Sequence, residues 1–293
     1  GEIQRFSFSR VVNGEVVALH ALDARRVLVV VRKLEASVPG AGLTAVLLNP
    51  GTGSWVEFSC RNPAAIPSVV GERDVSLAQK TTLGVGGNAE CFARASSEAA
   101  VGRALAWAHE QGRRVYVLGG GSNIVVSDAG VAGLVLAVRL RGIDWHDDGS
   151  VTVAAGEPWD GFVRGAVERG LAGVECLSGV PGLSGATPIQ NVGAYGQEVS
   201  ETIERVVAVD RATGERVELT RSDCDFAYRD SFFKRDAPDR FVVLAVVFRL
   251  RPGGAPKLAY PELERAVPAA PSLAEVRTTV LALRAKKSML FDP

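Results

Sequence analysis

The chain has 293 residues, of which 47% are hydrophobic and 23% are charged, a balance typical of a folded protein with room for two ordinary domains. Its 33 basic and 33 acidic residues give a formal net charge of zero, which argues against a nucleic-acid or membrane-surface role, and no apolar run is long enough to span a membrane. The four cysteines form no CxxC pair and the three histidines no ligand spacing, so we expect buried thiols in a reducing cytoplasm and neither a disulfide framework nor a metal site.

The first 74 residues predict a β-rich segment of unknown fold and role. Asn13-Gly14 is a hairpin signal among apolar residues, and residues 43–54 predict a strand followed by a Gly/Pro turn. A Pro-containing stretch that ends at Asp74 predicts a linker. None of these stretches carries a motif that points to chemistry.

Residues 75–147 predict a first subdomain. The sequence "AECFARA" predicts a strand, and the helix after it would begin at Ser97 and end at Gly112. Residues 114–118 and 133–140 predict buried strands, because both are rich in aliphatic and β-branched side chains. The stretch "NIVVSDAG" is strand-like with its own turn.

Residues 148–293 predict a second subdomain. A strand at 150–156 precedes a helix with Pro158 at its start and Gly170 at its end. Thr213-Gly214 marks a β-hairpin, "RFVVLAVVFRL" predicts an edge-to-core strand, and "PSLAEVRTTVLALRAKKS" predicts the last helix. Because many strands are joined by hairpins, we expect an α+β fold of two subdomains rather than a doubly wound parallel sheet.

A glycine-rich loop, Gly119-Gly120-Gly121-Ser122-Asn123, follows one of the predicted buried strands. Glycines let backbone N–H groups converge on an anion, and serine and asparagine add short side-chain donors. The loop matches neither a dinucleotide fingerprint nor a P-loop, because no helix and no Lys-Ser or Lys-Thr pair follows it. On its own it is equally well a tight turn between strands.

A second glycine-rich loop extends over residues 173–198 and contains two prolines among Ser, Thr, Gln and Asn. Apolar residues within it, such as Leu177 and Val192, are not typical of a solvated linker. We therefore expect its backbone to wrap an extended ligand, the alternative being a purely structural Ω-loop.

A third motif, "DFAYRDSFFK", places Arg229 within an aromatic-rich segment. Arginine keeps its proton at any useful pH and is suited to stabilising a developing oxyanion. The alternative is a core Arg–Asp pair under an aromatic lid. Tyr260 leaves the same choice between a structural and a functional role open. So does the basic cluster of Arg284, Lys286 and Lys287, which either complements a helix dipole or binds a phosphate.

The order of the motifs along the chain is more specific than any one of them. The sequences "TTLGVGG", "LGGGSN", "PIQNVGAYG", "YRDSFFK", "LAYPEL" and "LRAKKS" follow one another between Thr81 and Ser288. In this order they resemble the UDP-N-acetylenolpyruvoylglucosamine reductase family, flavoenzymes of bacterial peptidoglycan precursor synthesis, from about Ser76 to Pro293. The resemblance implies an FAD-binding fold of the vanillyl-alcohol-oxidase type, with two α+β subdomains around the cofactor.

The resemblance also implies the cofactor-binding residues. The first loop would hold the FAD pyrophosphate, the second would wrap the isoalloxazine and ribityl parts, and "TTLGVGG" would lie near the adenine. The FAD would be non-covalent, because the first loop contains no His or Cys. The expected residues are Thr82, Gly84, Gly86, Gly119, Gly120, Gly121, Ser122, Asn123, Pro181, Gly182, Ser184, Gly185, Ala186, Gln190, Asn191, Gly193, Ala194 and Gly196.

By the same resemblance, NADPH would reduce the FAD, and the reduced FAD would pass hydride to the enolpyruvyl group of UDP-N-acetylglucosamine enolpyruvate, giving UDP-N-acetylmuramate. Arg229 would be the catalytic residue that stabilises the enolate. Tyr195, Tyr228, Tyr260 and Lys287 would contact this UDP-sugar. The UDP-sugar is the expected partner, with neither nucleic acid nor a membrane.

The chain departs from the family pattern at both ends. Family members continue past "FDP" into a substrate domain that carries a proton-donating Ser and a late Glu, so we expect the residues up to Pro293 to be a catalytically incomplete FAD-binding core. Residues 1–74 have no counterpart in the family. The alternatives are another FAD-linked oxidase of the same fold, or a non-catalytic flavin- or nucleotide-binding module.

Overall fold

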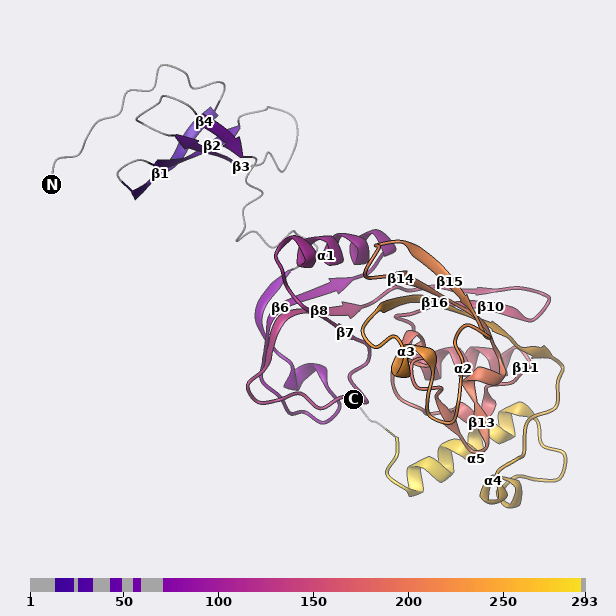
Figure 1. The fold of residues 1–293 in the computed structure, drawn as a ribbon. Coiled ribbons are helices and arrows are strands. Elements are labelled where there is room, and N and C mark those ends of the chain that lie inside the picture. The colour runs from indigo at the N-terminus through magenta and orange to yellow at the C-terminus, as the bar shows by residue number, and fades with distance from the viewer. Residues whose placement is uncertain (1–13, 24–25, 34–42, 49–54, 59–70, 291–293) are drawn as a thin grey trace. The chain divides into compact units, whose positions relative to one another are not determined.

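The computed structural model describes residues 14–23, 26–33, 43–48, 55–58 and 71–290. The chain divides into two compact units, Gly1–Ile66 and Pro67–Pro293. In the first unit an antiparallel sheet in chain order is formed by β1 (Gly14–Asp23), β2 (Arg26–Lys33), β3 (Leu43–Leu48) and β4 (Trp55–Phe58) (Figure 1). The predicted β-rich character of this segment is confirmed. Asn13 and residues 49–54, on which both turn predictions depend, lie outside the described residues.

The first sheet of the second unit is mixed and has the order β5-β6-β8-β7. Here β5 (Glu72–Ser76) runs antiparallel to β6 (Asn88–Ala95), while β6 and β7 (Val115–Leu118) both run parallel to β8 (Val131–Val138). Between β6 and β7, α1 (Glu98–Glu110) lies over one face of this sheet (Figure 1). The helix begins as predicted, because the Ser97 side chain accepts a hydrogen bond from the Ala100 N–H.

Two secondary-structure predictions for this region are wrong. The predicted linker ends inside β5, because its last residues, including Asp74, lie in a strand that pairs with β6. Residues 124–130 form no strand, since no strand of the described chain pairs with them and the Val125 side chain is 78% exposed. The subdomain boundary expected after residue 74 therefore falls within β5. The one expected after residue 147 falls after β9 (Ile143–Trp145), which already belongs to the second sheet.

The second sheet is antiparallel throughout and has the order β15-β14-β16-β10-β9. Pairing of β14 (Ile203–Asp210) with β15 (Arg216–Thr220) confirms the predicted hairpin around Thr213-Gly214. The strand predicted as edge-to-core, β16 (Phe241–Arg249), is central instead, between β14 and β10 (Ser150–Ala154). Its nearly continuous apolar sequence fits this position, because most of its side chains are buried.

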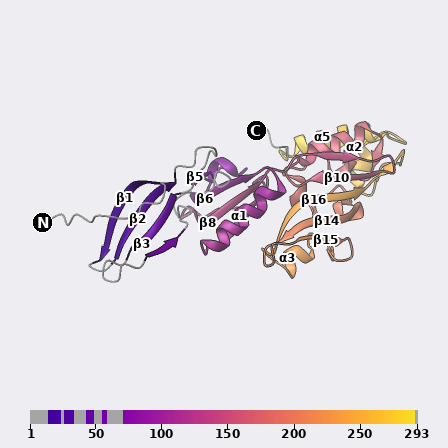
Figure 2. The same ribbon diagram turned by 90° about the horizontal axis from the view of Figure 1, so that it is seen from above.

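Two helices lie on the same side of the second sheet, α2 (Trp159–Glu168) and α5 (Leu273–Lys286) (Figure 2). Pro158 precedes α2 as predicted, and α5, the predicted last helix, begins at a capping box of Ser272 and Glu275. The Arg277 guanidinium of α5 donates to both carboxylate oxygens of Asp160 in α2, each at 2.7 Å. This ion pair joins α5 to α2.

The remaining described α-helices and strands, like four 3-10 helices of three residues each, are too short for a periodic sequence signal, and the sequence did not predict them. They are α3 (Phe232–Arg235), α4 (Pro261–Ala266), β11 (Leu171–Ala172), β12 (Gly193–Ala194), β13 (Gln197–Glu198) and β17 (Arg251–Pro252). None of the helices in the described part of the chain has both the length and the apolar character needed to cross a membrane.

Three cysteines of the second unit, Cys91, Cys176 and Cys224, are buried free thiols, as predicted. Burial raises the pKa of the Cys176 thiol and of the Cys224 thiol to about 12, so both stay protonated and unreactive near neutral pH. Cys60 lies outside the described residues.

Candidate functional site

The two glycine-rich loops meet at a cavity of 1120 Å³ in the second unit. The Asn123 Nδ2 of the first loop donates to the Gln190 Oε1 of the second at 2.9 Å, and the backbones also come close, since a Cβ added to Gly120 would lie 2.9 Å from the Gly182 Cα. A Cβ added to Gly182 would in turn lie 3.1 Å from the Ser122 Oγ. These glycines therefore do more than free the backbone, because only glycine lets the two loops come this close.

The first loop offers backbone donors at the wall of this cavity. The N–H groups of residues 120–123 donate to no other residue in the part of the chain that the structure describes. A neighbouring loop stabilises its conformation, since the Gly121 carbonyl accepts a hydrogen bond from the Thr82 N–H at 2.9 Å. A fixed loop with several unused N–H groups can bind an anion such as a phosphate.

Most of the residues expected from the sequence are brought together at this one cavity. Its lining includes Arg229 together with Gly119, Gly120, Gly121, Ser122, Asn123, Pro181, Gly182, Gly185, Ala186, Gln190, Gly193, Ala194, Tyr195, Gly196, Tyr228, Tyr260 and Lys287.

The other expected residues do not line the cavity. Thr82, Gly84 and Gly86 lie on the loop behind Gly121, of which Thr82 and Gly84 are exposed. Ser184 and Asn191 are buried in the protein, with 0% and 1% of their surface exposed. The Ser184 hydroxyl donates to the Glu157 carbonyl, so it stabilises the loop from inside.

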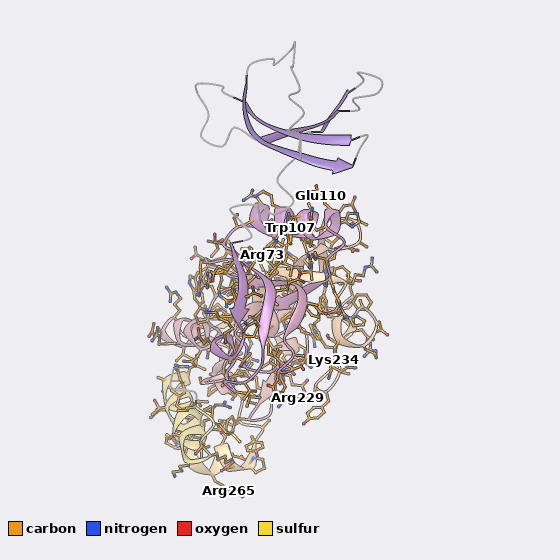
Figure 3. The ribbon with its side chains drawn as sticks, turned by 90° about the vertical axis from the view of Figure 1, so that its left-hand side faces the viewer. Arg73, Trp107, Glu110, Arg229, Lys234 and Arg265 are labelled. Atoms are coloured by element: carbon orange, nitrogen blue, oxygen red, sulfur yellow. The ribbon has the colours of Figure 1, made fainter. Side chains whose placement is uncertain are left out.

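The surroundings of Arg229 exclude a core Arg–Asp pair under an aromatic lid. The neighbouring carboxylate, Asp230, pairs with Arg235 of α3 at 2.9 Å instead. Tyr228 is 81% exposed, and its ring centroid lies 5.9 Å from the Arg229 Cζ at the surface rather than over a buried pair. Among the described residues, no carboxylate pairs with the Arg229 guanidinium, and the Arg229 carbonyl accepts a hydrogen bond from the Lys234 Nζ at 2.9 Å (Figure 3). The Arg229 charge is thus free to act on a ligand.

The turn that carries Arg229 is fastened to the second loop on both sides. The Asn191 Nδ2 donates to the Ala227 carbonyl at 2.9 Å, and the buried Ser231 hydroxyl donates to the Ile189 carbonyl at 2.6 Å. Asn191 and Arg229 both have positive φ, 46° and 55°. Such backbone persists where surrounding contacts enforce it, and it concentrates at functional sites.

We expect Asn191→Ala to destabilise the second unit by about 2–3 kcal/mol, because it removes a buried side chain that makes several hydrogen bonds. Asn191 also accepts from the Ser200 N–H and donates to Glu198, and its positive φ suits asparagine better than alanine. The midpoint of urea unfolding measures the loss. Gln190→Ala is the matched control: Gln190 lines the cavity and makes one exposed hydrogen bond, accepted from the Asn123 Nδ2, so its loss should cost less than about 1 kcal/mol. Equal losses in both variants would contradict this assignment.

Another part of the cavity wall is formed by Tyr195, Tyr260 and the C-terminal end of α5. The Tyr195 hydroxyl and the Arg284 Nε are buried and have no hydrogen-bond partner in the described part of the chain. Burial raises the pKa of Tyr195 and lowers that of Arg284. Buried polar atoms usually have partners, and both residues line the cavity, so a ligand can supply them here.

Several charged residues that the sequence did not single out as site residues also line the cavity: Glu198, Glu201, Arg211, Lys234 and Asp239. Glu198 is the last residue of the second loop and Glu201 follows shortly after, so both could have been included with the loop residues. Arg211 comes from the end of β14 and Lys234 from α3, and only the folded chain brings them to the loops.

Comparison with known proteins gives matches to the part of the chain that contains the two glycine-rich loops. A family model described as "FAD binding domain" matches residues 89–220. The UDP-N-acetylenolpyruvoylglucosamine reductase of Streptomyces avermitilis is 46% identical over 226 residues, which cover 75% of this chain and 62% of that protein. The reductase of Salinispora arenicola is 46% identical over 240 residues, covering 78% and 65%. The chain therefore spans less than two thirds of the length of these relatives.

Among solved structures, the UDP-N-acetylenolpyruvylglucosamine reductase of Thermus caldophilus superimposes with a TM-score of 0.56 and 26% identity. The match covers 73% of this chain and 69% of that protein.

Proposed function

The chain belongs to the UDP-N-acetylenolpyruvoylglucosamine reductase family, and from this we propose that it binds FAD and uses NADPH to reduce the enolpyruvyl group of UDP-N-acetylglucosamine enolpyruvate to UDP-N-acetylmuramate. The predicted FAD-binding α+β fold of the vanillyl-alcohol-oxidase type is confirmed. One observation carries the proposal: a single cavity joins the second glycine-rich loop to the N–H groups of residues 120–123 and the Arg229 guanidinium, which have no hydrogen-bond or carboxylate partner in the described chain. The cytoplasmic location stays a prediction.

The residues at the cavity fit FAD. The N–H groups of residues 120–123 would bind the pyrophosphate, and the second loop would lie along the ribityl and isoalloxazine parts. A cavity of 1120 Å³ has room for a cofactor of this size and part of a substrate. When bound, FAD supplies the hydride transfer between NADPH and the enolpyruvyl group, which no protein side chain can perform.

Arg229 would stabilise the negative charge that develops on the carboxylate side of the enolpyruvyl double bond. Its charge is permanent and has no carboxylate partner in the described chain, so no competing ion pair has to break. The hydrogen bonds from Asn191 and Ser231 would hold the turn in place, which keeps the guanidinium oriented before substrate arrives.

The UDP-sugar would bind at the end formed by α5. Lys287 would contact the diphosphate, while Tyr195, Tyr228 and Tyr260 would contact the rest of the molecule. The unpartnered Tyr195 hydroxyl and Arg284 Nε are donors that a phosphate or sugar oxygen can satisfy.

The proposal is tested first by the absorption spectrum of the purified protein. We expect a yellow protein that releases unmodified FAD on denaturation and that NADPH bleaches in the absence of oxygen. A colourless protein that takes up no added FAD would contradict the proposal. A yellow protein that NADPH leaves oxidised would instead support a non-catalytic flavin-binding module.

A further inference from the structure

Lys287, at the end of α5, is already paired before any ligand arrives. Its Nζ donates to the Glu262 Oε2 at 2.5 Å, and each side chain keeps 37% of its surface exposed. Lys287 lines the cavity, whereas Glu262 does not. Lys287, which is expected to face a diphosphate, is therefore already paired with a carboxylate of α4.

The helix that bears Glu262 is firmly attached. Leu263, the next residue, is fully buried and packs in one cluster with Val276, Val280 and Leu283 of α5. This packing anchors α4 on α5 and places Glu262 beside Lys287. The hydrogen bond from Lys287 to Glu262 also raises the pKa of Lys287, so the ammonium keeps its charge.

We propose that the Glu262 carboxylate competes with the diphosphate of a ligand for the Lys287 ammonium. This competition would set the affinity of the cavity for nucleoside diphosphates. The inference rests on the proposed function, because it takes the UDP-sugar diphosphate as the ligand of Lys287. A half-exposed ion pair is weak, so a phosphate can replace the carboxylate. The replaced carboxylate then lies beside the phosphate and repels it, which lowers the affinity for the anionic ligand but not for an uncharged one.

The test is a calorimetric titration of the flavin-loaded protein with UDP at low salt. Glu262→Gln keeps the size and polarity of the side chain and removes its charge. We expect this variant to bind UDP about threefold to fivefold more tightly than the unsubstituted protein, with a gain that shrinks as salt is added. Uridine, which lacks the diphosphate, should bind both proteins equally.

Two further variants identify the source of the effect. Glu264→Gln makes the same charge change on the same helix, at an exposed side chain that pairs with no described residue, and it should leave UDP affinity nearly unchanged. In a Lys287→Met background, Glu262→Gln should produce no gain, because the shared cation is absent.

The inference is overturned if Glu262→Gln binds UDP no more tightly than the unsubstituted protein, if Glu264→Gln shows the same gain, or if neither protein binds UDP. Flavin content and NADPH bleaching are measured on the same samples. A protein that is yellow and bleached by NADPH but indifferent to Glu262→Gln refutes the competitor role and leaves the proposed function standing, whereas a flavin-free protein refutes the function itself.

Discussion

Replacing Arg229 with alanine is expected to slow the reoxidation of NADPH-reduced flavin by the enolpyruvyl UDP-sugar about 10²–10³-fold, the usual effect of removing one preorganised donor to a developing oxyanion. NADPH bleaching and FAD content should hardly change, because the substitution leaves both glycine-rich loops intact. Arg229→Lys should recover only part of the rate, since an ammonium cannot reproduce the planar guanidinium. Anaerobic stopped-flow absorbance separates the two half-reactions.

Arg265→Ala serves as the control for loss of a surface arginine. Arg265 is exposed at the end of α4 and lies away from Arg229 (Figure 3). The Arg265→Ala substitution should leave the rates of both half-reactions unchanged. If Arg229→Ala reoxidises at the rate of the unsubstituted protein, the role given to Arg229 is wrong, however well placed it is in the cavity.

Gly120→Val is expected to weaken FAD binding about 10–100-fold in a chain that still folds. The added side chain would meet the Gly182 Cα at less than a normal contact distance and force the two loops apart. Overpacking of this kind typically costs about 1–3 kcal/mol, which corresponds to that loss of affinity when it falls on the binding site. Quenching of flavin fluorescence during titration of the apoprotein with FAD measures the effect.

A second glycine provides the matched control. Gly102 lies within α1, and a Cβ added there would meet nothing within 4 Å. Gly102→Ala should leave FAD affinity unchanged and raise helix stability by about 0.5–1 kcal/mol. Undiminished FAD binding by Gly120→Val would show that the contact between the loops is not needed for the cofactor site.

Much of the second unit follows from local sequence signals. The caps at Ser97 and Ser272 begin α1 and α5, and Thr213-Gly214 joins β14 and β15, because capping and turn chemistry act within a few residues. The order of the motifs, rather than any physical pattern, led to the family and to the cavity residues. That information lies in the whole sequence and not in its periodicity.

Sequence reasoning falls short where distant residues decide the outcome. An Arg–Asp pair at Arg229 was left open, and the structure decides against it because α3 brings Arg235 to Asp230. Asn191 stays a predicted cofactor-binding residue, but the loop sequence does not reveal that it is buried and holds the Arg229 turn. The central position of β16 depends on which strands fold beside it, and its own sequence cannot reveal them.

The central claim is that this cavity carries out reduction of an enolpyruvyl UDP-sugar. The most direct measurement is the flavin absorbance of the NADPH-reduced protein after anaerobic addition of UDP-N-acetylglucosamine enolpyruvate, with UDP-N-acetylglucosamine as the control. The account predicts that the yellow absorbance returns only with the enolpyruvyl compound and that UDP-N-acetylmuramate is formed in equal amount; the return is about 10²–10⁴-fold slower if the protein tested lacks the expected proton-donating Ser and late Glu. Flavin that stays reduced with both compounds, or that both reoxidise alike without this product, would contradict it.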